Sequence, residues 1–431
     1  MQVIINNFLN KRSLNECGFF LFLLGIFFLP SAVAIGILFL FPAFLIGSFI
    51  QKKPYLKDSW NFPFLIFGFF IIFSSIFHNF LSNNNYYEMW DPSLSLIGLG
   101  NWLPFIWVFW AAQPFLNSTS KRRTFALVLI FGTLPVLITG FGQYFLRWTG
   151  PLETLNGLII WYLKPLETQG GLSGLFNNQN YTGSWLNIVW PFCLALALDR
   201  GDNFFRKTFI YSFLVTTGLA TVLTFSRSAW LGLITSIPFV TGRKGVLFLL
   251  QITILLLVII ILVLTISPNF MRNLQSDLRA FMEKILLEFS SDGYDETIYP
   301  SRLSLYKSAF NSIKESPIFG TGAASFTEKF QKETNFWVGH SHNLLIELSI
   351  SYGIPSAILF FSSISKILLI SWKTIFFNNK NFIISTFDKA FWSATCFFLL
   401  SQLVDIQYFD GKISIICWVL IAGLKDIIEE S

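Results

Sequence analysis

The chain has 431 residues and a formal net charge of +6, and its composition is 53% hydrophobic, 18% aromatic and only 13% charged. Soluble domains carry about 25% charged residues, so this composition, with a mean hydropathy of +0.60, excludes an ordinary water-soluble domain. The positive charge does not indicate nucleic-acid binding, because the basic residues stand in short clusters between apolar runs, where they orient membrane segments. The sequence therefore predicts an all-α polytopic integral membrane protein.

The cysteines and the first apolar run carry little further information. The four cysteines lie in or beside apolar stretches, and none forms a CxxC pair. Their spacing predicts neither a disulfide framework nor a zinc site. We expect no cleavable signal peptide, because the first apolar run lacks a small-residue cleavage site and many more apolar runs follow it.

Apolar segments long enough to cross a bilayer recur along the chain, and we expect about twelve spans. They lie near residues 16–30, 31–50, 60–79, 101–117, 124–146, 181–199, 207–225, 228–241, 245–266, 343–371, 389–409 and 412–428. The first two form one continuous run that Pro30 divides, and this proline fits either a tight hairpin or a kink. The segment 228–241 is short for a full span.

Lys and Arg are distributed unevenly between alternate connections. One set carries Lys11, Arg12, Lys52, Lys53, Lys57, Lys121, Arg122, Arg123, Arg200, Arg206, Lys207, Arg243, Lys244, Lys373, Lys380, Lys389 and Lys425. The short connections of the other set carry only Arg147, Lys164, Arg227 and Lys412. By the positive-inside rule, both termini are predicted to be cytoplasmic.

Residues 267–342 form the one sizeable polar stretch, and alternation of the spans places it outside the cytoplasm. Apolar side chains recur every three or four residues from Phe270 to Phe289, which predicts an amphipathic helix on the membrane surface or over a cavity. A second helix is expected to begin near Ser301 and to stop at Pro317, before a turn at Gly320-Thr321-Gly322. Its expected apolar face consists of Leu303, Tyr306, Phe310 and Ile313.

The predicted organisation is one membrane domain in three parts. Residues 1–266 form an N-terminal bundle of transmembrane helices, 267–342 the extracytoplasmic helical loop, and 343–431 the C-terminal transmembrane helices. A smaller outer loop, 147–180, holds Trp148, Trp161 and Tyr162, which are typical of the membrane interface.

Two polar motifs lie at the ends of predicted spans in the first half of the chain. The segment Gly174–Tyr181 contains Asn177, Asn178 and Asn180. These asparagines either cap turns or bind sugar hydroxyls with their side-chain amides. The second motif, Thr224–Gly232, holds Arg227 in a very short break between two spans. An arginine there is either functional or extends along the membrane boundary to reach water.

Two further motifs flank the end of the outer loop. Ser301-Arg302-Leu303 is followed by the turn at Gly320-Thr321-Gly322, and an arginine in such a loop is usually a solvated surface residue. His342-Asn343 is followed after nine residues by Gly353. The chain has only 3 His, and a neutral His at a membrane boundary can accept a proton near neutral pH. The alternative is a His that bonds the backbone at a helix entrance.

Other polar residues near these motifs are ambiguous. His340 and His342 are not expected to form a metal site, because no third ligand is near in the sequence. Glu347 follows His342 by about one helical turn and either orients its ring or is a satisfied carboxyl. Asp405 falls within an apolar segment, where an ionisable residue suggests function, although no partner for it can be identified.

The order and spacing of these motifs resemble the O-antigen ligase and polymerase family of bacterial membrane proteins, most clearly from about 170 to 360. The late signature of that family is His, then Asn, Ser or Gln, nine residues, Gly, two residues and Gly. His342, Asn343 and Gly353 fit this pattern, whereas Ser356 stands where the last glycine is expected.

The resemblance implies an inverting glycosyltransferase in the bacterial plasma (inner) membrane that works without a metal or another cofactor. The donor would be a glycan on polyprenyl pyrophosphate and the acceptor a saccharide or lipid A-core-like molecule. Arg227 and Arg302 would hold the pyrophosphate, and His342 would be the general base. Asn177, Asn180 and Asn343 are the further candidates for substrate binding.

Two other classes of function remain open. Relatives of this family have been proposed as bicarbonate transporters, but a transporter is expected to carry ionisable or broken-helix sites near the middle of several spans. Here the charged residues stand mostly at span boundaries, and the polar motifs gather on one side. A non-catalytic membrane scaffold would not require Arg227, Arg302 and His342 to converge.

Overall fold

The computed structural model describes residues 11–81, 90–154, 156–157, 159–166, 170–199, 204–266, 300–377 and 385–430. These residues are mostly helical, with one antiparallel hairpin of two strands, β1 (Leu152–Thr154) and β2 (Ile159–Trp161). The chain divides into two compact units. Unit 1 comprises 1–68, 101–241 and 360–431, and unit 2 comprises 69–100 and 242–359.

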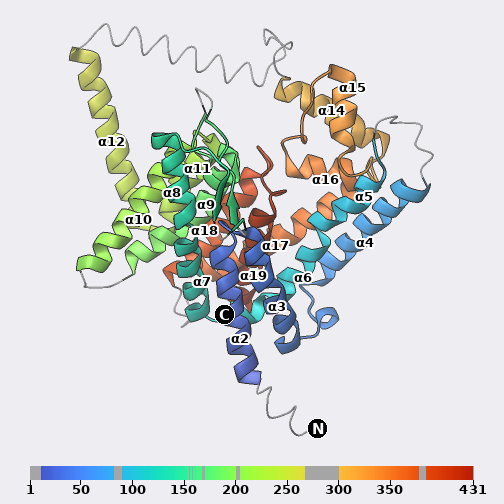
Figure 1. Cartoon of the computed structure of the whole chain (residues 1–431), viewed down its shortest axis with the longest axis horizontal. Helices are drawn as coiled ribbons and strands as arrows, with labels where there is room; N and C mark the ends of the chain where they lie inside the picture. The colour runs from blue at the N-terminus through green and yellow to red at the C-terminus, as the bar shows by residue number, and fades with distance from the viewer. Residues whose placement is uncertain are drawn as a thin grey trace. The chain divides into compact units, whose positions relative to one another are not determined.

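Unit 1 is a bundle built around α9 (Gln179–Leu198), in which every residue from Thr182 to Leu196 is buried. The helices α10 (Phe204–Leu223), α11 (Arg227–Thr241) and α18 (Thr386–Ser401) pack directly against α9 (Figure 1). The remaining helices of the bundle are α2 (Lys11–Phe28), α3 (Val33–Ile50), α6 (Leu103–Ala111), α7 (Thr119–Gly132), α8 (Leu134–Leu146) and α19 (Gly411–Glu430). Short helical turns lie at Tyr55–Lys57, Gln113–Phe115 and Gly174–Phe176.

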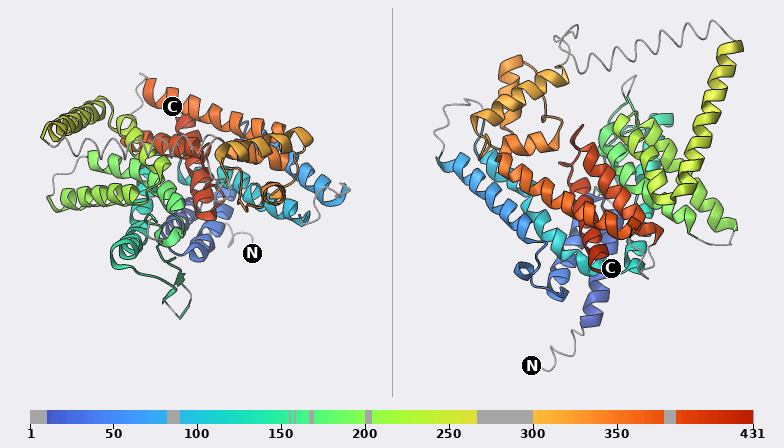
Figure 2. Two further views of the ribbon diagram at one scale, coloured as in Figure 1. Left: turned by 90° about the horizontal axis from the view of Figure 1, so that it is seen from above. Right: turned by 180° about the vertical axis from the view of Figure 1, so that it is seen from behind.

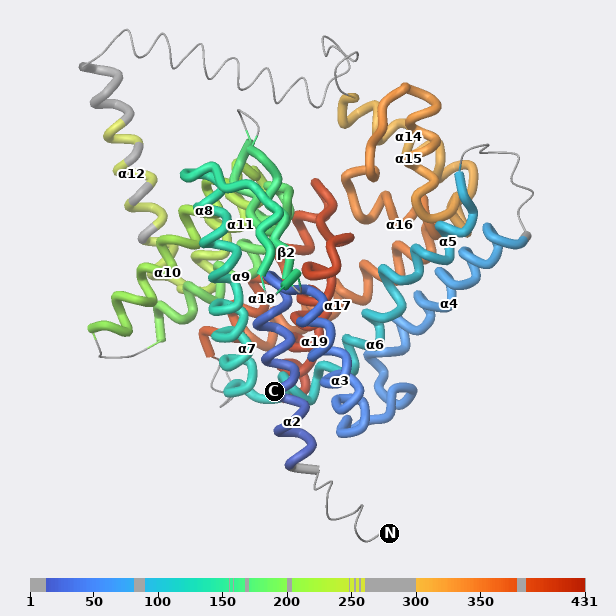
Figure 3. Tube along the Cα trace, in the orientation of Figure 1, coloured from blue at the N-terminus to red at the C-terminus, as the bar shows by residue number. Residues whose placement is uncertain are grey.

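Unit 2 contains a small helical cluster of α14 (Arg302–Glu315), α15 (Ser325–Thr334) and α16 (Leu344–Tyr352). These helices pack around a common core that includes Leu305, Phe330 and Ile350. The trace of the three helices can be followed in Figure 3. Unit 2 also contains α5 (Ser93–Gly98) and α12 (Arg243–Ile266). The helices α4 (Phe62–Ile76), continued by a π-helical turn at Phe77–Leu81, and α17 (Ile354–Phe377) contribute residues to both units.

Six helical segments in the described parts of the chain are long and apolar enough to cross a membrane. They are Val33–Ile50, Phe62–Phe80, Ser93–Ala111, Thr119–Leu146, Gln179–Leu198 and Ile354–Phe377. Several apolar helices of this length indicate an integral membrane protein with multiple spans. The larger predicted number of spans and the cytoplasmic placement of the termini stay predictions.

The first predicted pair of spans forms a tight hairpin rather than a kinked helix. The helices α2 and α3 are separated by Leu29–Ala32 and pack along one another. A β-carbon added to Gly36 would come within 2.9 Å of the backbone of Leu29. The two helices therefore approach closely because glycine leaves room for the neighbouring backbone.

The prediction of one continuous span over residues 343–371 is wrong. The helix α16 ends at Tyr352 and α17 begins at Ile354, because Gly353 between them has a φ of +88°. That backbone conformation is accessible to glycine but interrupts a right-handed helix. The predicted span 124–146, by contrast, falls within the candidate span Thr119–Leu146, in which Thr133 separates α7 from α8.

In the described part of the predicted loop, residues 300–342, one helix begins and ends close to the predicted residues but packs differently. The amphipathic helix expected from Phe270 to Phe289 lies outside the described residues. The second helix begins as predicted, since the Ser301 hydroxyl accepts a hydrogen bond from the Ser304 backbone N–H at 3.2 Å and caps α14. The expected apolar face is wrong in part, because Leu303 and Phe310 are 48% and 53% exposed, whereas Ile313 packs against the core. Small side chains face the core instead, namely Ser308, Ala309 and Ser312, together with Leu305.

The β1–β2 hairpin departs from the all-α prediction and lies within residues 147–180 (Figure 2). Its Trp161 indole N–H donates to the Ser31 carbonyl at 2.8 Å. This contact attaches the hairpin to the turn between α2 and α3. Strands of three residues are too short to leave an alternating pattern in the sequence.

Candidate active-site residues

His342 stands directly before α16 in a conformation that few residues with a β-carbon adopt. Its φ is +57°, in the left-handed region. The next residue, Asn343, caps the helix, and its side-chain oxygen accepts from the backbone N–H groups of Leu345 (3.0 Å) and Ile346 (3.2 Å). The chain thus turns sharply at His342 and presents it at the positive end of a helix dipole.

The residues around His342 hold this turn in place. The Ser341 backbone N–H donates to Oε2 of Glu347 at 2.8 Å. The His342 backbone N–H donates to Nδ1 of His340 at 3.1 Å, and the two imidazole rings pack edge to face with centroids 4.6 Å apart. Glu347 is only 6% exposed. Burial raises the pKa of the Glu347 carboxyl, and its hydrogen bonds with Ser341 oppose that rise.

Gly320 and Gly353 allow close packing of the backbone. A β-carbon on Gly353 would lie 1.9 Å from the Ile318 carbonyl oxygen, and one on Gly320 would lie 2.4 Å from the Ile350 oxygen. The Ile354 N–H donates to the Pro317 carbonyl at 2.8 Å. The turn at Gly320 and Gly322, predicted from sequence, is confirmed by their positive φ values of 71° and 101°. These glycines therefore let the turn after α14 pack closely against the end of α16.

Ser356, which stands where a glycine was expected, is accommodated without strain. Its side chain is fully buried and its hydroxyl donates to the Tyr352 carbonyl at 2.9 Å. A serine that bonds a carbonyl four residues earlier fits within a helix. The substitution therefore leaves the start of α17 intact.

Arg302 is the first residue of α14, directly after the buried cap Ser301. The helix that begins with Arg302 packs against α16, the helix that follows His342, within unit 2. The structure therefore places both predicted residues at helix beginnings in one small cluster. Arg227 belongs to unit 1.

Arg227 is also the first residue of a helix, α11, and it is exposed. The preceding turn places Phe225 in a left-handed conformation with φ +53°. Ser226 is buried, and its hydroxyl lies 3.2 Å from that of Ser228. The short polar break predicted from the sequence is thus a tight turn from α10 into α11.

Unit 1 brings the asparagine motif beside this turn. The Leu172 N–H donates to the Leu223 carbonyl at 2.8 Å. A β-carbon on Gly171 would come within 2.1 Å of the Thr224 oxygen, and the Gly171 N–H donates to Oε1 of Gln179 at 2.6 Å. The segment before α9 therefore lies directly against the residues that precede Arg227.

The asparagines of this motif have distinct local roles. Asn178 caps α9 by accepting from the Asn180 N–H at 2.8 Å. Asn177 has a φ of +55° and accepts from the Lys164 N–H at 3.1 Å. The Asn180 amide donates to Oδ2 of Asp405 at 3.0 Å. The turn and cap interpretation therefore applies to Asn177 and Asn178, and Asn180 has a carboxylate partner.

Asp405 belongs to a polar network that sequence reasoning missed. Gln407 donates to Oδ2 of Asp405 at 2.8 Å, and its side-chain oxygen accepts from Ser184 at 2.9 Å. Gln402 joins the network by donating to Gln407 at 3.1 Å. Asp405 in an apolar segment was the only sequence signal for this network, which fixes the turn after α18 against the start of α9.

These features define a polytopic helical membrane protein whose polar motifs gather at helix beginnings. Residues 212–361 match a family model described as O-antigen ligase. The chain therefore carries an O-antigen ligase domain over that segment, which confirms the resemblance noted in the sequence. No curated protein matches the chain. This match over part of the chain suggests an enzyme of the ligase or polymerase type.

Proposed function

We propose that the chain transfers a glycan from a polyprenyl-pyrophosphate-linked donor to a saccharide or lipid A-core-like acceptor on the outer face of the bacterial plasma membrane. One observation carries this proposal. The O-antigen ligase segment, residues 212–361, includes Arg227, Arg302 and His342. The proposed base and the two proposed pyrophosphate contacts therefore all lie in the segment that matches the family model.

In the proposed reaction, an acceptor hydroxyl oxygen attacks the anomeric carbon of the donor glycan. The bond from that carbon to the pyrophosphate oxygen breaks, and its electron pair leaves with the lipid pyrophosphate. The acceptor proton passes to the imidazole of His342, which acts as the general base. Attack from the face opposite the leaving group inverts the anomeric centre.

The departing lipid pyrophosphate concentrates negative charge, and guanidinium groups stabilise it because they stay protonated and bind two oxygens at once. Arg227 is the first residue of α11, and Arg302 is the first residue of α14. Helix beginnings present backbone N–H groups and a positive dipole end to anions. Both arginines are thus suited to phosphate binding by charge and by helix position.

The asparagines are proposed as contacts to the sugars. The side-chain amide of Asn180 donates a 3.0 Å hydrogen bond to Oδ2 of Asp405. This bond fixes the orientation in which the amide would meet a ligand. Asn177 lies in the same segment, ahead of α9. Asn343 caps α16 next to His342, and we propose that it helps to align the acceptor.

The proposal is tested by reconstituting the purified full-length chain in liposomes with a polyprenyl-pyrophosphate oligosaccharide and candidate acceptors. Formation of a glycosylated product supports it, and a ladder of products indicates polymerisation, whereas a single adduct indicates ligation. Failure to transfer with every donor and acceptor, together with bicarbonate uptake by the same liposomes, would overturn it in favour of transport.

The arginine roles have matched controls within the chain. Arg227→Ala and Arg302→Ala should each lower the transfer rate by about 10²-fold, the typical effect of losing one group that stabilises the transition-state charge. Arg206→Ala and Lys307→Ala remove exposed cations from α10 and α14 and should leave the rate nearly unchanged. Equal effects in all four variants would remove the arginines from the mechanism.

A further inference from the structure

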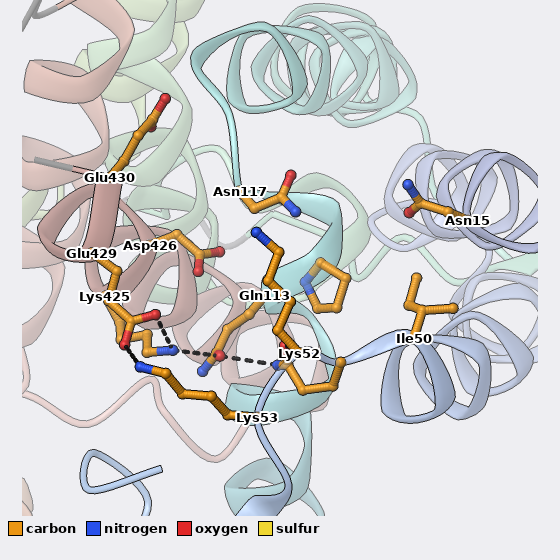
Figure 4. Close-up of a pocket in the computed structure, with 12 residues that line it drawn as sticks. Asn15, Ile50, Lys52, Lys53, Gln113, Asn117, Lys425, Asp426, Glu429 and Glu430 are labelled. Carbon is orange, nitrogen blue, oxygen red and sulfur yellow. Dashed lines mark hydrogen bonds and ion pairs between the residues drawn. The ribbon is translucent and has the colours of Figure 1, made fainter. Parts of the chain in front are cut away.

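A cavity of about 380 Å³ lies in unit 1, at the end of the bundle that the basic residues predict to be cytoplasmic. It is bordered by the last turns of α19, by the segment after α3 and by the residues between α6 and α7 (Figure 4). Its volume falls in the range of about 300–1,000 Å³ that small-molecule sites occupy. The cavity is separate from Arg227, Arg302 and His342, none of which lines it.

Most of the charged groups around the cavity are already paired. Lys425 is 2% exposed and contacts Glu429 at 2.9 Å and Asp58 at 3.0 Å. Lys53 also contacts Glu429, at 3.0 Å. Glu430 accepts from Arg122 at 2.8 Å. These ion pairs line the cavity, and their charges are already neutralised without a ligand.

Two charged side chains of the lining remain available. Asp426 is 7% exposed, and its Oδ2 atom has no hydrogen-bond partner among the described residues. Lys52 is exposed and forms no ion pair with the described part of the chain. Both side chains are directed into the cavity in Figure 4. A buried carboxylate oxygen without a partner is costly, so Asp426 favours a donor from a ligand.

The charges exclude ligands of a single sign. A simple cation at Asp426 would leave Lys52 without a counter-charge. A simple anion at Lys52 would leave Oδ2 of Asp426 without a hydrogen-bond donor. A molecule with one ammonium and one phosphate group matches both available side chains at once.

Apolar surface next to the cavity indicates that this molecule is a lipid. Ile50 lines the cavity, and the neighbouring α3 residues Phe49, Leu45 and Phe41 are 78%, 41% and 56% exposed. Exposed apolar side chains on a membrane helix contact acyl chains. A free zwitterion would leave this surface unused.

We propose that the cavity binds the headgroup of a zwitterionic phospholipid with a primary amine, of the phosphoethanolamine type, from the cytoplasmic leaflet. The ammonium group donates to Asp426, and the phosphate pairs with Lys52. A primary amine is required, because a quaternary ammonium has no N–H to donate. The site is distinct from the proposed transfer chemistry and does not depend on it.

The test is lipid titration of the full-length protein by native mass spectrometry. The probes are phosphatidylethanolamine, phosphatidylcholine and phosphatidylglycerol with identical acyl chains. The amine lipid should bind about tenfold more tightly than the other two, as expected from one charge-assisted hydrogen bond to a buried group. Equal binding of all three lipids, or tighter binding of phosphatidylglycerol, would overturn the proposal.

Variants assign the preference to this cavity. Asp426→Asn should abolish the preference for phosphatidylethanolamine over phosphatidylcholine, and Lys52→Gln should weaken binding of both. Lys57→Gln, an exposed lysine that does not line the cavity, is the matched control and should behave as wild type. Because Lys52 is exposed, its variant is expected to fold. Unchanged lipid preference in both cavity variants would contradict the assignment.

Discussion

The backbone N–H of Ser341 donates a 2.8 Å hydrogen bond to Oε2 of Glu347, a buried carboxylate on the first turn of α16. The two bonded residues lie on either side of His342 in the sequence. Together with the Asn343 cap, it stabilises the turn in which His342 adopts a φ of +57°. The backbone position of the proposed base therefore depends on Glu347.

Replacing Glu347 should reveal whether this hydrogen bond supports the turn. Glu347→Ala leaves the Ser341 N–H buried without its acceptor and should lower the free energy of unfolding by about 1–3 kcal/mol. Glu347→Gln keeps an oxygen at the same position and should cost less. Thermal unfolding of the two variants in detergent measures the difference, and equal losses would show that the acceptor does not matter.

The Gly353 break is predicted to be essential for the packing of α16. Gly353→Ala would place a β-carbon 1.9 Å from the Ile318 oxygen at a φ of +88°, so it should cost about 2 kcal/mol or more. Gly339→Ala is the matched control, since its nearest neighbour would be a Trp337 ring atom at 3.6 Å. If both variants unfold at the same temperature, the close approach at Gly353 is not required.

The bond between Asn180 and Asp405 should appear as energetic coupling. Asn180→Ala, Asp405→Ala and the double variant form a cycle whose coupling energy, from the transfer rate, should be about 0.5–3 kcal/mol. Asn180 and Asp199 stand near opposite ends of α9, so the same cycle on that pair should give a value near zero. Additive effects for Asn180 and Asp405 would mean that the carboxylate does not orient the amide.

Two adjacent arginines should differ strongly in their effect on stability. The Arg122 side chain is fully buried and bonds Asp388 at 2.7 Å and Glu430 at 2.8 Å, whereas that of Arg123 is 43% exposed and pairs with Asp199. Arg122→Ala leaves the carboxylate of Asp388 buried without its cationic partner and should cost about 3–5 kcal/mol. Arg123→Ala should cost about 1 kcal/mol or less. Comparable unfolding temperatures for the two variants would contradict the burial of this pair.

Local signals in the sequence predicted some features of the fold. Ser301 is a typical helix cap and Pro317 a typical stop, so the position of α14 could be predicted. The break at Gly353 was missed because apolar residues continue on both sides of it. The prediction of the buried face of α14 was wrong in part, because small residues such as Ala309 pack against the core in place of larger apolar residues.

The candidate site was predictable by residue type but not by partner. Arg227, Arg302 and His342 stand out because ionisable residues are rare at membrane boundaries. One partner of Asp405 is Asn180, which is 225 positions away in the chain. Such contacts depend on the packing of α9 against α18, and no local pattern in the sequence encodes them.

The transfer rate of His342→Asn in reconstituted protein is the most direct test of His342 as the general base. Asparagine tolerates the left-handed conformation better than alanine, so this substitution removes the imidazole and keeps the turn. We expect a loss of about 10²–10⁴-fold, with an unchanged unfolding temperature and with full activity in the exposed control Lys332→Ala. Transfer at the wild-type rate by His342→Asn would contradict the role of His342 as the general base.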